Sequence, residues 1–101
     1  MTSRDPDRGM KALEGELLGE AALSLGIAGR RMAEALALLA ACPPATEASE
    51  RRVLLAAAAE ATYAYVVQRE ALGWRDTDAA LDHYGVPAEV RARLGVRTIT
   101  D

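Results

Sequence analysis

Apolar side chains recur with the period of an α-helix between residues 9 and 41. At 100° per residue, five large apolar side chains of this segment fall on one stripe, which we call the large stripe: Leu18, Leu25, Met32, Leu36 and Leu39. Charged side chains fall well away from that stripe, among them Glu16, Glu20, Arg30 and Glu34. The pattern predicts one long amphipathic helix over residues 9–41.

Two adjacent prolines end this helix, and a second long helix follows. Pro44 disfavours helical backbone at Pro43, and neither proline has an amide hydrogen to donate. The next helical pattern covers residues 46–72, with Thr46 as its predicted N-cap and Gly73 as the left-handed residue after its end. Because a short proline turn joins two long helices, the sequence predicts an antiparallel helical hairpin.

Two shorter helices are expected after the hairpin, over residues 76–84 and 87–94, the first ended by Gly85 and the second followed by Gly95. We expect the largest apolar groups of this region to anchor the short pair to the hairpin, namely Trp74, Tyr84 and Leu94. Residues 1–8 are expected to form a flexible arm and residues 95–101 a tail. The 101 residues thus predict a single all-α domain.

Four glycines lie inside the first predicted helix, where each costs about 1 kcal/mol relative to alanine. On the helix projection they belong to a face of small side chains, and these glycines are Gly15, Gly19, Gly26 and Gly29. The second helix has a matching small face, made of Ala57, Ala61 and Ala64. Folding at the prolines places Gly26 opposite Ala61, so we predict a close-packing seam between the helices. The alternative is a backbone opening for a ligand.

The composition favours self-association. Twenty-two residues are alanine, four are aromatic and none is phenylalanine, so the core buries little area per residue. If the seam holds the hairpin together, the large stripe still needs cover, and Leu23, Ile27 and Leu38 lie on yet another side. We therefore predict a homodimer in which two hairpins form a four-helix bundle.

The net charge of −3 is spread along the chain, so no segment offers the basic field that binds nucleic acid. The N-terminus is charged where a signal peptide is apolar, and the longest uncharged stretch, residues 35–46, contains two prolines. We therefore expect no membrane-spanning segment. Cys42 is the only cysteine, which fits a cytoplasmic protein. Eleven of the twelve basic residues are arginine, which is typical of GC-rich bacterial genomes.

Candidate catalytic and metal-binding residues are few. His83 is the only histidine, and it lacks the Glu-x-x-His or His-x-x-x-His spacing of a metal site. Cys42 has no base nearby in the sequence to activate its thiol. The sequence therefore predicts no catalytic residue, no metal site and no cofactor.

A cluster of polar side chains is expected beside the small seam, made of Glu16, Glu20, Glu60, Gln68 and Arg69. The hairpin register brings Arg69 near Glu16 or Glu20. Such a cluster either fixes the register through hydrogen bonds and ion pairs or lines a small polar pocket for an anionic ligand. The sequence leaves both interpretations open.

Three stretches of the chain carry a resemblance to a family. These are "LEGELLGEAALSLGIAGRRMAEAL" (residues 13–36), "VVQREALGWRD" (66–76) and "YGVPAEVRARLG" (84–95). With them the chain resembles an uncharacterised family of short bacterial proteins classed as a domain of unknown function. The resemblance implies an all-helical fold and brings no activity, cofactor or site residue. It also implies that Gln68-Arg69-Glu70 and the segment from Tyr84 to Pro87 are family features.

Three functional hypotheses follow. The leading one is a small non-enzymatic interaction or scaffold protein that acts as a homodimer, with another protein as a further partner. The alternative is a nucleic-acid-associated regulator that uses the C-terminal helix-turn-helix-like pair, although its acidic residues cancel the charges of Arg91 and Arg93. The third is a ligand-binding or enzymatic helical bundle with Arg69, Glu20 and Glu60 at its site.

Overall fold

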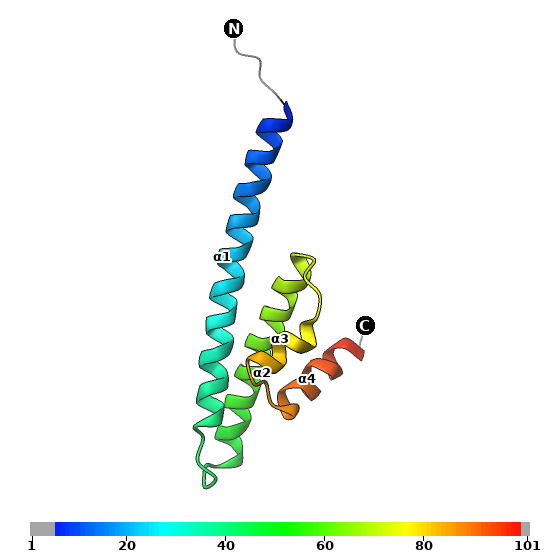
Figure 1. Cartoon of the computed structure of the whole chain (residues 1–101). Coiled ribbons are helices and arrows are strands. Elements are labelled where there is room, and N and C mark those ends of the chain that lie inside the picture. The colour runs from blue at the N-terminus through cyan, green and yellow to red at the C-terminus, as the bar shows by residue number, and fades with distance from the viewer. Residues whose placement is uncertain (1–5, 100–101) are drawn as a thin grey trace.

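The computed structural model describes residues 6–99, and within them the side chains of residues 15–17 and 19–94. This part of the chain contains four helices and no strand, which confirms the all-α class. The helices are α1 (Pro6–Ala40), α2 (Ala48–Ala71), α3 (Thr77–His83) and α4 (Ala88–Ile99) (Figure 1).

The helices extend into both terminal segments that the sequence predicted to be non-helical. Within the expected arm 1–8, residues 1–5 lie outside the described residues, whereas α1 already begins at Pro6, since proline suits the first turn of a helix. Within the expected tail 95–101, α4 continues through Gly95 to Ile99, and residues 100–101 lie outside the described residues. A glycine ends a helix only where it leaves helical backbone, and inside one it costs only about 1 kcal/mol.

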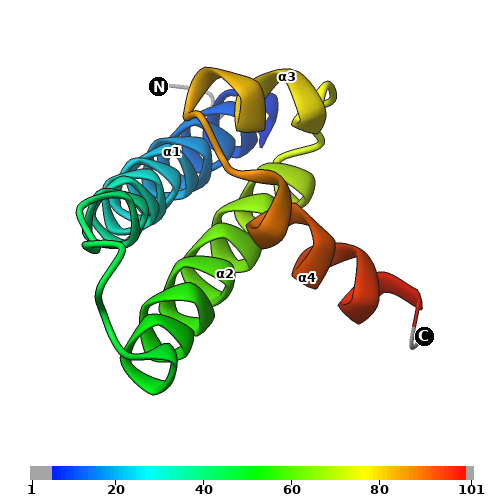
Figure 2. The same ribbon diagram turned by 90° about the horizontal axis from the view of Figure 1, so that it is seen from below.

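Helices α1 and α2 lie side by side, and the chain reverses direction in the loop that joins them (Figures 1 and 2). Within this loop the Thr46 amide donates to the Pro43 carbonyl at 3.0 Å. The N-cap of α2 is Glu47 rather than the predicted Thr46, and it makes no side-chain capping bond. With 35 residues against 24, α1 is longer than α2 by about 16 Å and extends beyond it.

The predicted large stripe of α1 faces the core. Leu25, Met32, Leu36 and Leu39 are buried, as expected, and the side chain of Leu18 lies outside the described residues. Residues of α2 bury their side chains in the same core, namely Ala58, Ala59, Thr62 and Tyr65. The Thr62 hydroxyl donates to the Ala58 carbonyl at 2.7 Å, so this buried hydroxyl is satisfied within its own helix.

Helices α3 and α4 cover the core from one side of the α1–α2 pair (Figure 2). Leu81, Val86 and Val90 are buried there, while the expected anchors Tyr84 and Leu94 are partly buried against the core. The third expected anchor, Trp74, is 50% exposed, so its assignment was wrong. From Leu25 to Leu39 the large stripe is therefore covered within one chain and does not need a second copy.

Two glycines end helices as predicted. Gly73 has φ 73° after α2 and Gly85 has φ 67° after α3, both in the left-handed region that glycine adopts without strain. Asp76, the N-cap of α3, has φ 58°, the one positive φ of a non-glycine residue among the described residues.

An ion pair fastens α4 to α2. Both terminal nitrogens of Arg51 donate to the Glu89 carboxylate, Nη1 at 3.0 Å to Oε2 and Nη2 at 2.6 Å to Oε1. The hydrogen bonds from Arg51 lower the pKa of Glu89 below its ordinary value of 4.5. The same pairing raises the pKa of Arg51.

This pairing predicts a pH-dependent contribution to stability. Because the pKa of Glu89 is lower in the folded chain, its contribution is complete above pH 4.5 and is lost as the pH falls through the folded-state value. Glu89→Gln should slightly lower the urea midpoint at pH 7, and the difference from the wild type should shrink by about pH 3. The exposed carboxylate of Glu70 offers the control Glu70→Gln. An equal difference at both pH values would contradict the prediction.

Candidate interaction site on helices α1 and α2

Three of the four seam glycines face solvent. Gly15, Gly19 and Gly26 are exposed, and a Cβ at Gly15 or Gly19 would meet nothing within 4 Å. At Gly26 it would meet only the Arg30 guanidinium of the same helix, at 3.7 Å. The predicted close packing of Gly26 against Ala61 is therefore wrong. Because α1 turns its large stripe toward the core, the small face about 100° around the helix points outward.

Gly29 is the exception, since it is buried. A Cβ there would lie 2.8 Å from the Tyr84 hydroxyl and 3.4 Å from a ring carbon of Tyr65. The rings of Tyr65 and Tyr84 meet edge to face with centroids 5.2 Å apart, and burial raises the pKa of Tyr84. Gly29 thus admits a tyrosine pair rather than the alanines of α2. On the helix projection Gly29 lies closer to the large stripe than the other three glycines do, so the sequence alone could have distinguished it.

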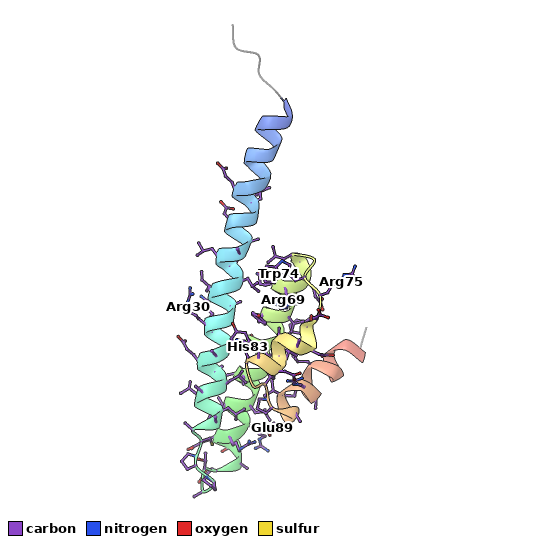
Figure 3. All side chains as sticks on the ribbon, in the orientation of Figure 1. Arg30, Arg69, Trp74, Arg75, His83 and Glu89 are labelled. Atoms are coloured by element: carbon purple, nitrogen blue, oxygen red, sulfur yellow. The ribbon has the colours of Figure 1, made fainter. Side chains whose placement is uncertain are left out.

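The predicted polar cluster is not assembled. The Arg69 guanidinium lies over the Trp74 ring at 5.3 Å from its centroid and donates to the Arg75 carbonyl at 2.7 Å (Figure 3). Its Nε is buried without a hydrogen-bond partner. Glu16 and Glu20 are exposed on α1, and neither pairs with Arg69. Arg69 therefore fixes the connection between α2 and α3, a role that sequence reasoning missed because the partners are a backbone carbonyl and a ring.

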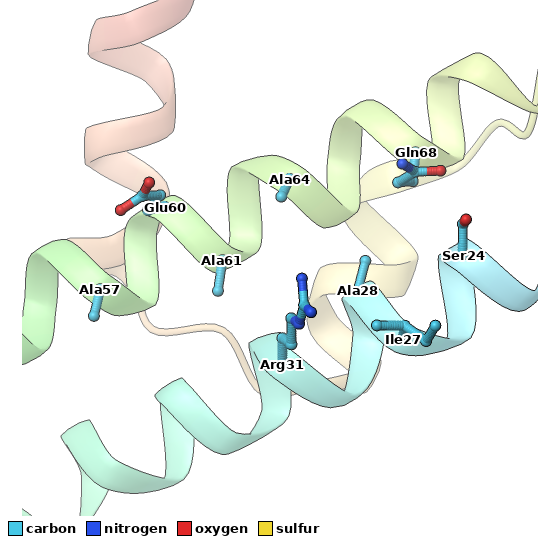
Figure 4. A pocket seen from close by; sticks show the side chains of 9 residues that line it. All are labelled: Ser24, Ile27, Ala28, Arg31, Ala57, Glu60, Ala61, Ala64 and Gln68. Carbon is cyan, nitrogen blue, oxygen red and sulfur yellow. The ribbon is translucent and has the colours of Figure 1, made fainter.

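Glu60 and Gln68 instead line a groove between α1 and α2, with a volume of about 610 Å³ (Figure 4). The α2 wall also contains the small residues Ala57, Ala61 and Ala64, and the α1 wall consists of Ser24, Ile27, Ala28 and Arg31. The predicted small face of α2 thus borders a groove instead of contacting glycines. Helices α3 and α4 lie behind the two long helices in this view.

Arg31 and Glu60 are the charged side chains that line the groove among the described residues, one on each wall. Both are exposed, and they form no ion pair with each other. The groove therefore presents one unpaired positive and one unpaired negative group, both accessible from outside.

A second hollow, of about 530 Å³, lies where α1 ends and α2 begins. Its lining is mostly apolar and consists of Leu38, Ala41, Cys42, Pro43, Thr46, Glu50, Val53 and Leu54. Leu38 is 61% exposed and Val53 69%. Ile27 and Val67 are also exposed, at 38% and 43%. Val67 shares a helix face with Glu60, seven residues before it.

We define the open face as the surface of α1 and α2 on the side away from α3 and α4. It carries Ile27, Arg31, Leu38, Val53, Glu60 and Val67. It combines four exposed large apolar side chains with the unpaired charges of Arg31 and Glu60, and the exposed Glu50 lines the second hollow at its loop end.

Of the two C-terminal arginines named for nucleic-acid binding, Arg91 is bonded within the chain and Arg93 is exposed. Arg91 donates to the Asp82 carboxylate at 2.7 Å and to the Val86 carbonyl at 3.0 Å. Helix α4 has 12 residues, more than the eight of the predicted 87–94 segment, and Glu89 on it pairs with Arg51. The guanidinium of Arg91 is therefore already bonded to α3 and to the turn that follows it, which leaves less of it to offer to phosphate.

His83 and Cys42, the remaining candidates for chemistry, contact an aromatic ring and a backbone carbonyl. The His83 ring meets the Tyr84 ring edge to face at 5.6 Å, and the Cys42 thiol lies 3.8 Å from the Pro43 carbonyl. Among the described side chains, no three of His, Cys, Asp and Glu are placed to hold a metal ion together. No helix in the described part of the chain is long and apolar enough to cross a membrane.

Comparison with known proteins gives one match. The sequence model of a family of unknown function covers residues 1–101, which confirms the resemblance to an uncharacterised domain family. No curated protein and no solved structure matches the chain. The match therefore brings no activity, and the open face has to be interpreted from its own residues.

Proposed function

The chain belongs to this family of unknown function, DUF6665, and we propose that it is a non-enzymatic helical interaction protein that acts as a cytoplasmic homodimer through the open face. The observation that carries the proposal is the exposure of Leu38 and Val53, at 61% and 69%, on the same face as the exposed Ile27 and Val67. Soluble monomers rarely gather several exposed large apolar side chains on one face, whereas binding surfaces do.

Burial of this face supplies the free energy for association. At roughly 25 cal/mol per Å², each large apolar side chain that leaves water stabilises the complex by about 1 to 2 kcal/mol. The pairing unit is the antiparallel hairpin of α1 and α2, and two hairpins that meet face to face form a four-helix bundle. The part of the large stripe from Leu25 to Leu39 plays no part in this contact, because its residues are already buried within the chain.

The proposal is tested by the solution mass and by Leu38→Glu. At about 10 μM the wild type should sediment with twice the chain mass of 10.7 kDa. Leu38→Glu should raise the dimer dissociation constant by about 100-fold, because two-fold symmetry buries the new charge twice. Ala92→Glu, on an exposed position of α4, is the matched control and should leave the dimer intact.

Circular dichroism should show the same helical content for both variants, because each replaced residue is exposed. A folded wild-type chain that sediments as a monomer at about 100 μM would overturn the proposal. So would a dimer that Leu38→Glu and Ala92→Glu weaken equally, since the contact would then lie elsewhere.

A further inference from the structure

Side chains of the open face form three levels along the two helices. At one end, Ile27 of α1 lines the groove together with Ala64 and Gln68 of α2, so it lies level with Val67 between them. In the middle, Arg31 lines the same groove as Glu60. At the end near the loop, Leu38 shares the second hollow with Val53.

Each level therefore holds one side chain of each helix, and the two are complementary: apolar beside apolar, positive beside negative, apolar beside apolar. Within one chain the members of each level stand on opposite walls, and Arg31 and Glu60 form no ion pair there. A partner could pack its own α1 against this α2 with residues of the same level facing each other. Apolar side chains would then meet apolar ones, and Arg31 and Glu60 would each meet an opposite charge.

We propose that this partner is a second copy of the chain, related by a two-fold axis parallel to the long helices. Such an axis places α1 of one copy over α2 of the other and keeps every residue at its own height. Arg31 then meets Glu60 of the partner subunit, and Leu38 meets Val53 of the partner subunit. The proposal rests on the proposed function, because it specifies the geometry of the same dimer.

The charges of the open face select this axis. A two-fold axis that crosses the helices at the middle level would place α1 over the partner's α1, with Arg31 near the partner's Arg31 and Glu60 near the partner's Glu60. Like charges at a contact are unfavourable, whereas the parallel axis makes two attractive pairs.

The area of the open face is close to what a stable dimer needs. The 24 residues of α2 give a length of about 36 Å, and two helices side by side are about 20 Å wide, so each copy can bury roughly 700 Å². A stable interface buries about 800 Å² per partner. A second copy therefore fills the open face along its whole length.

Charge reversal tests the arrangement, through Arg31→Glu and Glu60→Arg in separate chains. Each variant alone should have a dimer dissociation constant about 10-fold higher than the wild type, because both ion pairs become like-charge contacts. An equal mixture of the two variants should restore the wild-type value within about 3-fold, since each pair then joins opposite charges across the two chains. Arg30→Glu, the same change at the neighbouring exposed residue that does not line the groove, is the control and should have little effect.

Cross-linking distinguishes the two axes. In chains that carry Cys42→Ser, a mixture of Leu38→Cys and Val53→Cys chains should form a disulfide between the two kinds of chain under oxidation. The axis that crosses the helices predicts no such disulfide. It predicts instead that the mixture of Arg31→Glu and Glu60→Arg chains binds more tightly than the wild type, because each like-charge contact then becomes an attractive pair.

The outcomes separate the two proposals. A monomeric wild type would overturn the proposed function and this inference with it. A wild-type dimer for which Arg31→Glu behaves like Arg30→Glu, or for which the mixed chains do not cross-link, would overturn only the arrangement.

Discussion

Gly29→Leu should lower the free energy of unfolding by more than about 3 kcal/mol, a large part of the stability of a domain of this size. Already a Cβ at this position would lie 2.8 Å from the Tyr84 hydroxyl, which is closer than atoms can pack. The Tyr84 ring has little room to withdraw, because it meets the Tyr65 ring edge to face. The larger side chain would therefore separate the C-terminal helices from α1. Urea unfolding at one fixed protein concentration measures the loss.

The matched control is Gly26→Leu, which lies one turn earlier on the same helix. Gly26 is exposed, and a Cβ there meets only the flexible Arg30 guanidinium. This variant should gain up to about 1 kcal/mol, because leucine is a better helix former than glycine. The close-packing seam predicted the reverse, namely that Gly26→Leu disrupts the hairpin. A strongly destabilised Gly26→Leu would restore the seam hypothesis.

Gly29→Ala, with and without Tyr84→Phe, tests whether the Tyr84 hydroxyl is the atom that requires glycine at position 29. Gly29→Ala should destabilise the chain by about 1 kcal/mol, since the overlap with Tyr84 outweighs the gain in helix propensity. Combined with Tyr84→Phe, which removes the hydroxyl, Gly29→Ala should cost less than it does alone. The next Tyr84 atom lies at 3.6 Å, an ordinary contact distance. Additive effects in this double-mutant cycle would show that the hydroxyl does not set the requirement for glycine.

Met32→Ala should lower the free energy of unfolding by about 2 to 4 kcal/mol. Met32 is fully buried, at 0% exposure, among the buried side chains of the core. Truncation removes its contacts and leaves a cavity that the rigid helices on either side cannot close. The loss should be visible as a lower urea midpoint and a lower melting temperature.

Leu23→Ala, on the same helix, is the control for Met32→Ala. Leu23 is 64% exposed, so its truncation should change stability by no more than about 0.5 kcal/mol. Similar losses for both variants would mean that α1 is rotated about its axis relative to the structure. The pair therefore tests which stripe of α1 faces the core.

Periodicity predicted the helices well because it depends on local geometry. The stripe that ends with Leu36 and Leu39 recurs at helical spacing, and both side chains are buried. Gly73 and Gly85 were placed correctly because a left-handed residue after a helix is a local requirement. The exposure of Leu38, on another side of α1, also follows from the projection.

The candidate sites could not be predicted to the same degree. Arg69 binds a carbonyl and a ring of the loop that follows α2 rather than the carboxylates of α1, and no spacing rule identifies such partners. The expected anchoring role of Trp74 failed for a related reason. Its ring packs against the Arg69 guanidinium, so it stays half exposed without joining the core.

By itself, the sequence determined the all-helical class, the long helices, the turns and the stripe of α1 that is buried, because these depend on backbone preference and on periods of a few residues. Only the tertiary structure decided what the glycines and the alanines face. Rotation of α1 about its axis is set by how α2, α3 and α4 together cover the large stripe. That rotation exposes Gly26 to solvent, packs Gly29 against Tyr65 and Tyr84, and leaves Ala61 beside an open groove.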